Sequence, residues 1–208
     1  MKQMTLEEFT RTTASSEPVP GGGSISALAG ALAAALAQMV AGLTIGKKKY
    51  EDAREEMEAA VPVLEGLWTE LLEDVARDSA SFDGYMKALS LPKDTEEEKN
   101  VRMQAMQEGL KEAVKVPLSV AEKSIKILPY AKLVVTRGNA TALSDGLVCA
   151  MMARSAVLGA VCNVKINLKS IHDETFVGQT YARATLLEQK ADLMEAEIRS
   201  TAFERLNQ

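Results

Sequence analysis

The stretch SISALAGALAAALAQMVAGLTIG, Ser24 to Gly46, contains no charged residue and consists largely of Ala, Leu and Gly. Its 23 residues could span a bilayer as a helix, but Ser, Gln and Thr interrupt it and the sequence has no second stretch of this kind. We therefore predict a helix that Ser24 caps and that ends near Gly46. It should lie at the centre of a folded domain or at a subunit interface, not in a membrane.

The rest of the chain also favours helices. The 208 residues are 47% hydrophobic but only 4% aromatic, so the apolar residues are mainly Ala, Leu, Val and Met, most of which prefer helix to strand. Further helices are expected at about 6–13, 51–89 with Pro62 as a kink or break, 96–116 continuing from Pro117 to 128, 141–168 and 174–205. The predicted fold is all-α: one domain over residues 1–208, a bundle of long helices around the central Ala/Gly-rich helix.

Charge and cysteine content bound the class of protein. A net charge of −5 gives no general attraction for nucleic acid or for an anionic membrane. The first eleven residues are polar and lack the apolar core of a signal peptide, so we expect a cytoplasmic protein. Cys149 and Cys162 lie about 20 Å apart on one predicted helix, too far for a disulfide. Both are expected to be buried in a reducing compartment.

A glycine-rich loop precedes the central helix. Gly21, Gly22 and Gly23 leave backbone N–H groups unshielded, and with Ser24 they lead into a helix N-terminus that favours an anion or an electron-rich ligand edge. The alternative is a flexible joint with a serine cap. The loop lacks the Gly-Lys-Ser/Thr ending of a P-loop, and no strand precedes it as a dinucleotide fingerprint requires.

At the other end of the central helix stand three lysines. Lys47 and Lys48 could hold carboxylates of an acidic ligand. The alternative is a solvated helix end, where positive charge complements the helix dipole.

Three helical carboxylates are candidates for proton transfer. Asp78 and Asp83 are five positions apart in the predicted long helix, so their side chains point about 140° away from each other. Asp145 begins an otherwise apolar helix, where a dipole partner in the first turn is the structural alternative.

Asn163 and Asn167 end the helix that Asp145 begins, and they share a face because they are one turn apart. Asp145 precedes Asn163 by five turns, about 27 Å along the axis. These groups can join one site only if a second chain or a bend brings opposite ends together. No metal site is expected, because the chain has one histidine, His172, and two separated cysteines.

Several motifs occur in a fixed order: PVPGGGS at 18–24, GKKKY at 46–50, LPK at 91–93, GN at 138–139, SD at 144–145 and NVKIN at 163–167. Together they resemble the formiminotetrahydrofolate cyclodeaminase/methenyltetrahydrofolate cyclohydrolase family over about residues 6–202. The chain is similar to the cyclodeaminase half of the bifunctional formiminotransferase-cyclodeaminases. We find no formiminotransferase part.

The resemblance implies an all-helical subunit that forms a homodimer or a larger even assembly. It places a tetrahydrofolate derivative near the glycine-rich loop and the subunit interface, with no metal and no cofactor beyond the folate substrate. One family reaction closes formiminotetrahydrofolate to methenyltetrahydrofolate and releases ammonia. The other hydrolyses methenyltetrahydrofolate to formyltetrahydrofolate.

Both reactions pass through a tetrahedral carbon between two folate nitrogens, which calls for a proton shuttle and for orienting amides. Asp145 is our first choice for the shuttle and Asp83 the second. The amides of Asn139, Asn163 and Asn167 would orient the pterin or the bridging carbon. The N–H groups of Gly22, Gly23 and Ser24 would hold glutamate carboxylates together with Lys47 or Lys48. We favour the cyclodeaminase, with the cyclohydrolase as the alternative and a non-enzymatic helical interaction module as a further one.

Overall fold

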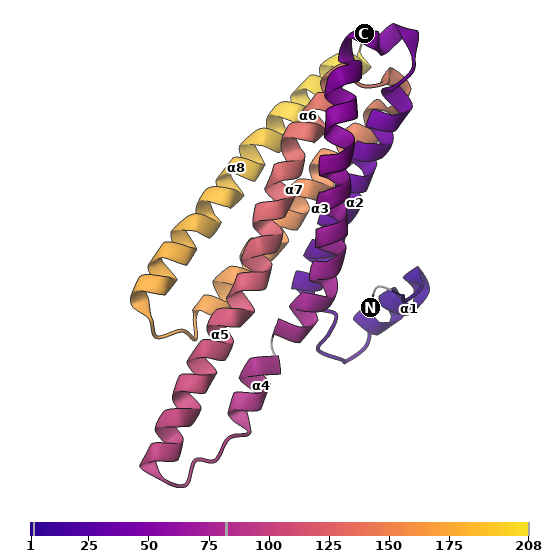
Figure 1. Ribbon diagram of the computed structural model, residues 1–208. Helices are drawn as coiled ribbons and strands as arrows, with labels where there is room; N and C mark the ends of the chain where they lie inside the picture. The colour runs from indigo at the N-terminus through magenta and orange to yellow at the C-terminus, as the bar shows by residue number, and fades with distance from the viewer. Residues whose placement is uncertain (2, 82, 208) are drawn as a thin grey trace.

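The computed structural model describes residues 1, 3–81 and 83–207, and that part of the chain contains helices and no strand (Figure 1). The elements, in chain order, are α1 (Leu6–Thr13), α2 (Gly22–Thr44), η1 (Lys48–Ala53), α3 (Arg54–Ser81), α4 (Asp83–Leu89), α5 (Glu96–Ser124), η2 (Ile125–Ile127), α6 (Leu128–Arg137), η3 (Ala140–Ala142), α7 (Leu143–Leu168) and α8 (Glu174–Leu206). The predicted all-α fold is confirmed.

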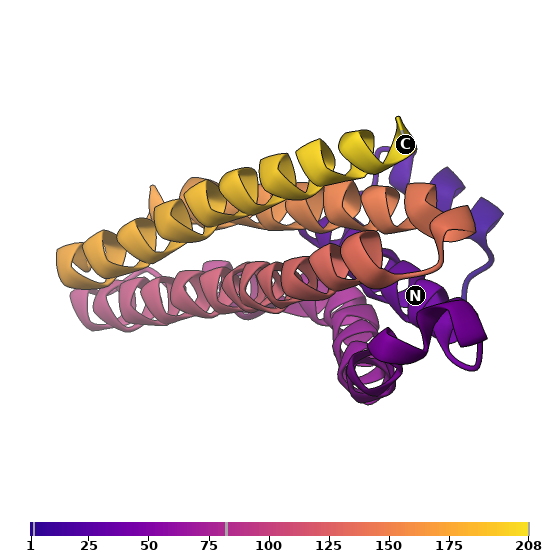
Figure 2. The ribbon, with the colours of Figure 1, turned by 90° about the horizontal axis from the view of Figure 1, so that it is seen from above.

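The long helices form an elongated bundle around α2 and α7 (Figures 1 and 2). α2 packs against α3 on one side and against α7 on the other, and α5 packs against both α3 and α7. α8 covers α7 and α6, and α4 lies along the first half of α5. The buried apolar side chains of these helices form one main core cluster.

Small residues let the central helices approach closely. A Cβ atom added at Gly30 of α2 would lie 2.6 Å from Ser124 Oγ of α5, 3.1 Å from Leu71 Cδ1 of α3 and 3.5 Å from Ala156 Cβ of α7. A side chain at position 30 would therefore require Ser124 and Leu71 to move, so glycine favours this close crossing of four helices. The predicted central position of the Ala/Gly-rich helix is therefore explained by its lack of side-chain bulk.

Three helices, α1, α5 and α8, begin with a side-chain cap. Thr5 and Thr95 each form a complete capping box with the glutamate three residues later, and Asp173 accepts from the N–H of Phe176 at the start of α8. The prediction that Ser24 caps the central helix is wrong. That helix begins at Gly22 with Gly21 as its N-cap, so the glycines form its first turn.

Two other expectations needed correction. The predicted single helix over 51–89 is divided into η1, α3 and α4, and Pro62 lies inside α3 without ending it. Cys149 is buried as expected, whereas Cys162 is exposed because it lies on the outer face of α7.

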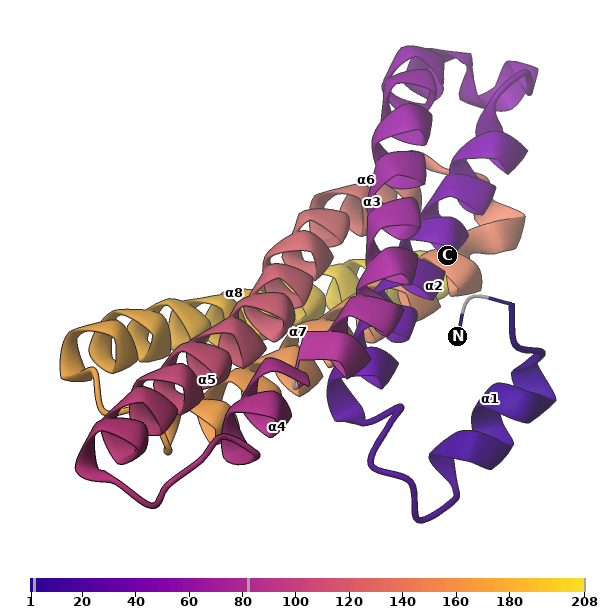
Figure 3. The ribbon, with the colours of Figure 1, turned by 60° about the horizontal axis from the view of Figure 1, so that its bottom comes forward.

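The N-terminal helix α1 lies beside the bundle rather than within it (Figures 1 and 3). None of its residues is buried, although Phe9 packs partly against the core. The bundle is thus built by α2 to α8.

Two segments, Gly22–Thr44 and Ala140–Leu168, are long and apolar enough to cross a bilayer. Half of each segment is buried inside the bundle, as in the core helices of folded domains. Their exposed half includes apolar side chains such as Leu32, Met39 and Val148. Length and hydropathy therefore give only weak support for a membrane span, and the exposed apolar half needs another explanation.

The contact between α4 and α5 supplies a test of the packing. A Cβ added at Gly109 would lie 2.7 Å from the backbone nitrogen of Tyr85 and 2.8 Å from its Cα. Because these are backbone atoms, we expect Gly109→Ala to lower the free energy of unfolding by about 1–3 kcal/mol in urea titrations. Gly66→Ala is the control: no atom lies within 4 Å of that Cβ, so a gain of about 0.5–1 kcal/mol is expected. Equal stability of the two variants would show that α4 is not held against α5.

Candidate functional site

The first turn of α2 lies against the last turns of α3. Ser24 is fully buried, and its Oγ lies 2.9 Å from Asp78 Oδ2, 3.0 Å from the carbonyl oxygen of Val75 and 3.1 Å from Ser79 Oγ. Asp78 also accepts a hydrogen bond from the backbone N–H of Ser24. A partly buried carboxylate therefore sits at the N-terminus of the central helix.

The glycines of this turn allow the contact. A Cβ at Gly23 would overlap the Asp78 carboxylate, with only 2.6 Å to Oδ2. A Cβ at Gly22 would lie 3.2 Å from Asn163 Nδ2 of α7. The absence of side chains thus brings the backbone of α2 directly onto an acid of α3 and an amide of α7.

Burial raises the pKa of Asp78 above the ordinary 3.8, because the charged form loses hydration. The hydroxyl and N–H of Ser24 act in the opposite direction by donating to the carboxylate, and the negative charge of Asp74 adds to the increase. Three other carboxyl groups, those of Glu8, Glu98 and Asp173, have a lowered pKa because backbone N–H groups donate to them. A raised pKa in a partly buried acid is typical of a group that exchanges protons with a ligand.

Asn163 and Asn167 lie on the side of α7 that reaches this end of the bundle. Asn163 Nδ2 donates to the carbonyl oxygen of Gly159 at 2.8 Å, and Asn167 Nδ2 donates to that of Ala113 in α5 at 3.0 Å. Both side chains are half-buried. Asn163 lies beside Gly22 in the first turn of α2, the turn that Asp78 also contacts. Asn167 lies one turn further along α7, and its hydrogen bond helps to hold α5 in place.

The remaining predicted residues lie at the opposite end of α2. Asn139 is buried, its N–H donates to Thr44 Oγ1 at 2.9 Å, and its Oδ1 accepts from the N–H of Thr141. Its Nδ2 donates to the carbonyl oxygen of Leu43 at 3.3 Å. These bonds fix the joint between α2 and α7, so the Asn139 amide has a structural role.

Lys47, Lys48 and Asp145 share this second end. The lysines are exposed just beyond α2, and Asp145 is half-buried in the first turn of α7. The 23 residues of α2 separate the two ends by about 33 Å. Within one chain, therefore, Lys47 and Lys48 do not join the glycine turn, and Asp145 does not join Asn163. The 27 Å separation predicted from the sequence agrees with this arrangement.

Asp83, the other predicted proton shuttle, is the first residue of α4 and is exposed. The helix that was predicted to carry both acids ends at Ser81, so the calculated angle between Asp78 and Asp83 does not apply. Of the two, Asp78 is the acid that contacts α2.

Comparison with known proteins decides the family. A family model described as formiminotransferase-cyclodeaminase matches residues 5–185. The methenyltetrahydrofolate cyclohydrolase of Methylorubrum extorquens is 36% identical over 203 residues, 98% of either chain. The chain belongs to the formiminotransferase-cyclodeaminase family. The resemblance predicted from the ordered motifs is thereby confirmed.

Other relatives in this family differ in length. The formimidoyltransferase-cyclodeaminase of Gallus gallus is 41% identical over 186 residues, which are 89% of this chain but only 34% of that protein. The chain thus spans about a third of that relative. A crystal structure of formiminotetrahydrofolate cyclodeaminase from Thermotoga maritima is similar in fold, with a TM-score of 0.87, 31% identity and coverage of 99% and 98% of the two chains.

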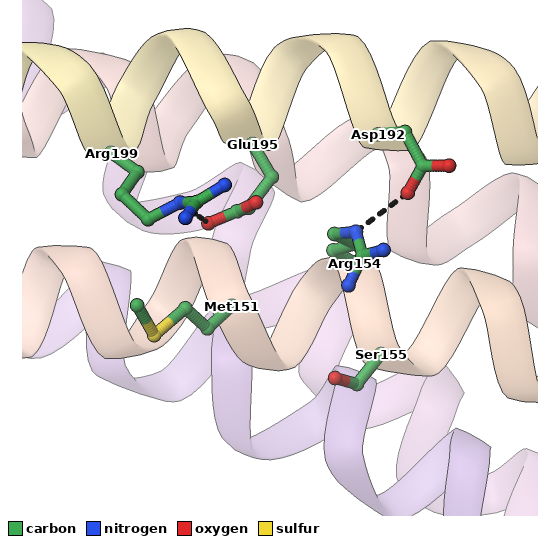
Figure 4. A pocket seen from close by; sticks show the side chains of 6 residues that line it. All are labelled: Met151, Arg154, Ser155, Asp192, Glu195 and Arg199. Carbon is green, nitrogen blue, oxygen red and sulfur yellow. Dashed lines mark hydrogen bonds and ion pairs between the residues drawn. The ribbon is translucent and has the colours of Figure 1, made fainter.

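A pocket elsewhere on this family member contains none of the predicted site residues. It lies between α7 and α8, measures about 430 Å³ and is lined by Met151, Arg154, Ser155, Asp192, Glu195 and Arg199 (Figure 4). Arg154 Nε donates to Asp192 Oδ1 at 2.6 Å, and Arg199 Nε donates to Glu195 Oε1 at 3.0 Å. Each guanidinium is thus paired with a carboxylate of α8.

Metal ligands do not converge in the described part of the chain: no group of three His, Cys, Asp or Glu side chains there could hold an ion. His172 is exposed, and its backbone N–H donates to Gln107 Oε1. At the first turn of α2, the Asp78 carboxyl group can exchange a proton, and backbone and side-chain amides can form hydrogen bonds.

The raised pKa of Asp78 predicts a pH-dependent stability. Between the ordinary pKa and the folded-state pKa the folded protein holds more protons than the unfolded chain, so stability falls as the pH rises through this window. The substitution Asp78→Asn removes the titrating group and therefore removes this loss of stability at higher pH. We expect the variant to be more stable than the wild type at pH 7 and the difference to vanish below pH 3.8, measured by urea unfolding across the pH range. Asp83→Asn, at an exposed position, is the control and should change neither the stability at pH 7 nor its pH dependence. A stability difference for Asp78→Asn that does not vary with pH would contradict a raised pKa of Asp78.

Proposed function

We propose that the protein is a formiminotetrahydrofolate cyclodeaminase in which Asp78 is the proton shuttle. The observation that carries this proposal is the contact of Asp78 with Ser24 in the first turn of α2. Asn163 of α7 lies against the same turn, beside Gly22. Family membership supplies the substrate class, a tetrahydrofolate derivative.

The hydrogen bonds around Ser24 can accommodate either protonation state of Asp78. The Ser24 hydroxyl has one proton but two acceptors within 3.0 Å, the Val75 carbonyl oxygen and Asp78 Oδ2. When it donates to Val75, the contact with Asp78 is satisfied by a proton on the carboxyl group. When Asp78 loses that proton, Ser24 can donate to the carboxylate instead. The arrangement accommodates both protonation states without moving the backbone.

In the proposed reaction the N10–H nitrogen of the substrate attacks the formimino carbon attached to N5. A new N–C bond forms, and the carboxylate of Asp78 accepts the proton of the attacking nitrogen. The formimino group, an amidine, enters protonated as =NH2+, so this attack leaves an NH2 group on the tetrahedral carbon. Asp78 then returns the proton to that nitrogen, and its bond to carbon breaks as NH3 leaves and the methenyl cation forms. No oxidation state changes, so the scheme needs no cofactor beyond the folate substrate.

The glycine turn and Asn163 would bind and orient the substrate. The N–H groups of Gly22 and Gly23 are in the first turn of α2, where they have no intrahelical acceptor. They can donate to an electron-rich edge of the ligand beside Asp78, and the Asn163 amide can donate and accept at the same place. These groups would hold the reacting carbon close to the shuttle.

Methenyltetrahydrofolate hydrolysis is the second candidate. It is favoured by one observation: the Methylorubrum extorquens cyclohydrolase matches over 98% of either chain. In that reaction Asp78 would take a proton from the attacking water and return it to the leaving ring nitrogen. The two candidates are separated by mixing the protein with each folate and following the absorbance of methenyltetrahydrofolate, which rises for the cyclodeaminase and falls for the cyclohydrolase.

Asp78→Asn should lower kcat by about 10²–10⁴-fold, because a general acid–base contributes that much, while KM changes little. Asp83→Asn is the matched control on the same side of the bundle and should keep full turnover. Loss of turnover in Asp145→Asn with normal turnover in Asp78→Asn would move the shuttle to the other end of α2.

We further propose that the chain forms a homodimer through α2 and α7. Each helix leaves apolar side chains exposed at intervals that place them on one face: Ile25, Leu32, Met39 and Leu43 on α2, and Val148, Met151 and Ile166 on α7. An apolar patch on core helices is typical of a subunit interface. A two-fold axis across these helices would bring the glycine turn of one subunit near Lys47, Lys48 and Asp145 of the other.

Leu32→Lys places a charge in the middle of this face and should convert the dimer to a monomer at micromolar concentration, measured by light scattering. Leu186→Lys is the control, since Leu186 is 64% exposed on α8 outside the proposed interface. Dissociation by both variants, or by neither, would rule out this interface.

A further inference from the structure

Asp74 is a fully buried acid that the proposed reaction does not use. It lies on α3 one turn before Asp78, so the two side chains share a face and are about 6 Å apart. Its Oδ2 accepts from Lys123 Nζ of α5 at 2.6 Å, and its Oδ1 accepts from Arg77 Nη1 at 2.7 Å. Asp74 therefore forms a buried ion pair with Lys123 at short range from Asp78.

The two cations that pair with Asp74 differ in their surroundings. The Lys123 side chain is only 15% exposed and also lies 3.3 Å from Glu70, whereas the Arg77 side chain is 59% exposed. Solvent therefore screens the charge of Arg77 much more than that of Lys123. Lys123 is the main counter-charge to Asp74 inside the bundle.

The other surroundings of Asp78 carry little charge. The first turn of α2 contributes Gly22, Gly23 and Ser24, and α7 contributes the neutral amide of Asn163. Ser79 Oγ donates to the sulfur of Met1 at 3.3 Å, so the first residue of the chain also reaches this end of α3. The negative charge of Asp74, one turn away on the same face of α3, raises the pKa of Asp78, although less than burial does.

We propose that the buried Asp74–Lys123 ion pair controls how readily Asp78 holds its proton, and thereby sets the pH range in which the enzyme works. Asp74 is thus a positioning residue that acts through Asp78 and does not touch the substrate. The inference rests on the proposed function only for the link from Asp78 to turnover.

The pair predicts shifts of opposite sign. Asp74→Asn removes a negative charge and leaves Lys123, so the Asp78 carboxylate is favoured and its titration moves to lower pH. Lys123→Met leaves the negative charge of Asp74 less compensated, so the titration moves to higher pH. A buried charge one helical turn away should shift the midpoint by on the order of one pH unit. The double variant removes both charges and should return close to the wild type.

The experiment measures the Asp78 titration by carbon NMR in the folate-free protein, and the pH profile of kcat, for the wild type and these three variants. Lys123→Arg keeps the charge and should keep both wild-type profiles. Where Lys123→Met melts much earlier than the wild type, Arg77→Met replaces it, with a smaller shift to higher pH because Arg77 is more exposed.

The expected result is two opposite midpoint shifts that cancel in the double variant, in the NMR titration and in the kcat profile alike. Shifts of the same sign in both single variants, or an unshifted NMR midpoint, would overturn the inference, since a purely structural pair has no reason to give opposite signs. NMR shifts as expected with unshifted kcat profiles would support the electrostatic coupling and refute Asp78 as the shuttle, so the two proposals fail separately.

Discussion

The close contact of α2 with α3, α5 and α7 is the constraint on which the structure depends. A Cβ atom at Gly30 would lie within 3.5 Å of atoms of α3, α5 and α7. On the same helix Ala27, Ala34, Ala37 and Ala41 are completely buried. Such packing gains dispersion contacts along the whole helix but tolerates no added bulk. It fixes the register of α2 against α3, and that register determines which acid of α3 meets the first turn of α2.

The site follows from this register. The hydrogen bond from Ser24 Oγ to the carbonyl oxygen of Val75 aligns the N-terminus of α2 with Asp78. Because Gly23 has no side chain, the Asp78 carboxylate fits beside it. Burial then disfavours the ionised acid while Ser24 stabilises it. The same packing that holds the core together therefore places a proton-exchanging group where backbone N–H groups are available to a ligand.

The helices, most of their caps and the family could be predicted from the sequence, because amphipathic spacing, capping boxes and ordered motifs are local signals. The choice among Asp78, Asp83 and Asp145 could not, since it depends on how α2 and α3 pair. One signal was available: Asp78 follows Leu71 and Val75 at helical spacing, and both are buried. An acid that continues a buried apolar stripe is a better candidate than an acid at a helix start. The start of α2 was misplaced because three glycines have no capping side chain to read.

The position of α2 in the chain also has a consequence for synthesis. α2 begins at Gly22 and its partner α7 at Leu143, about 120 residues later. At about 5–20 residues per second, a ribosome needs on the order of ten seconds to deliver α7 after α2 has emerged. α3 is synthesised directly after α2, so the two helices can pair as a hairpin while the face of α2 that later packs against α7 is still exposed to solvent. A nascent chain with so apolar a surface is a natural client for the chaperones that bind near the ribosomal exit tunnel.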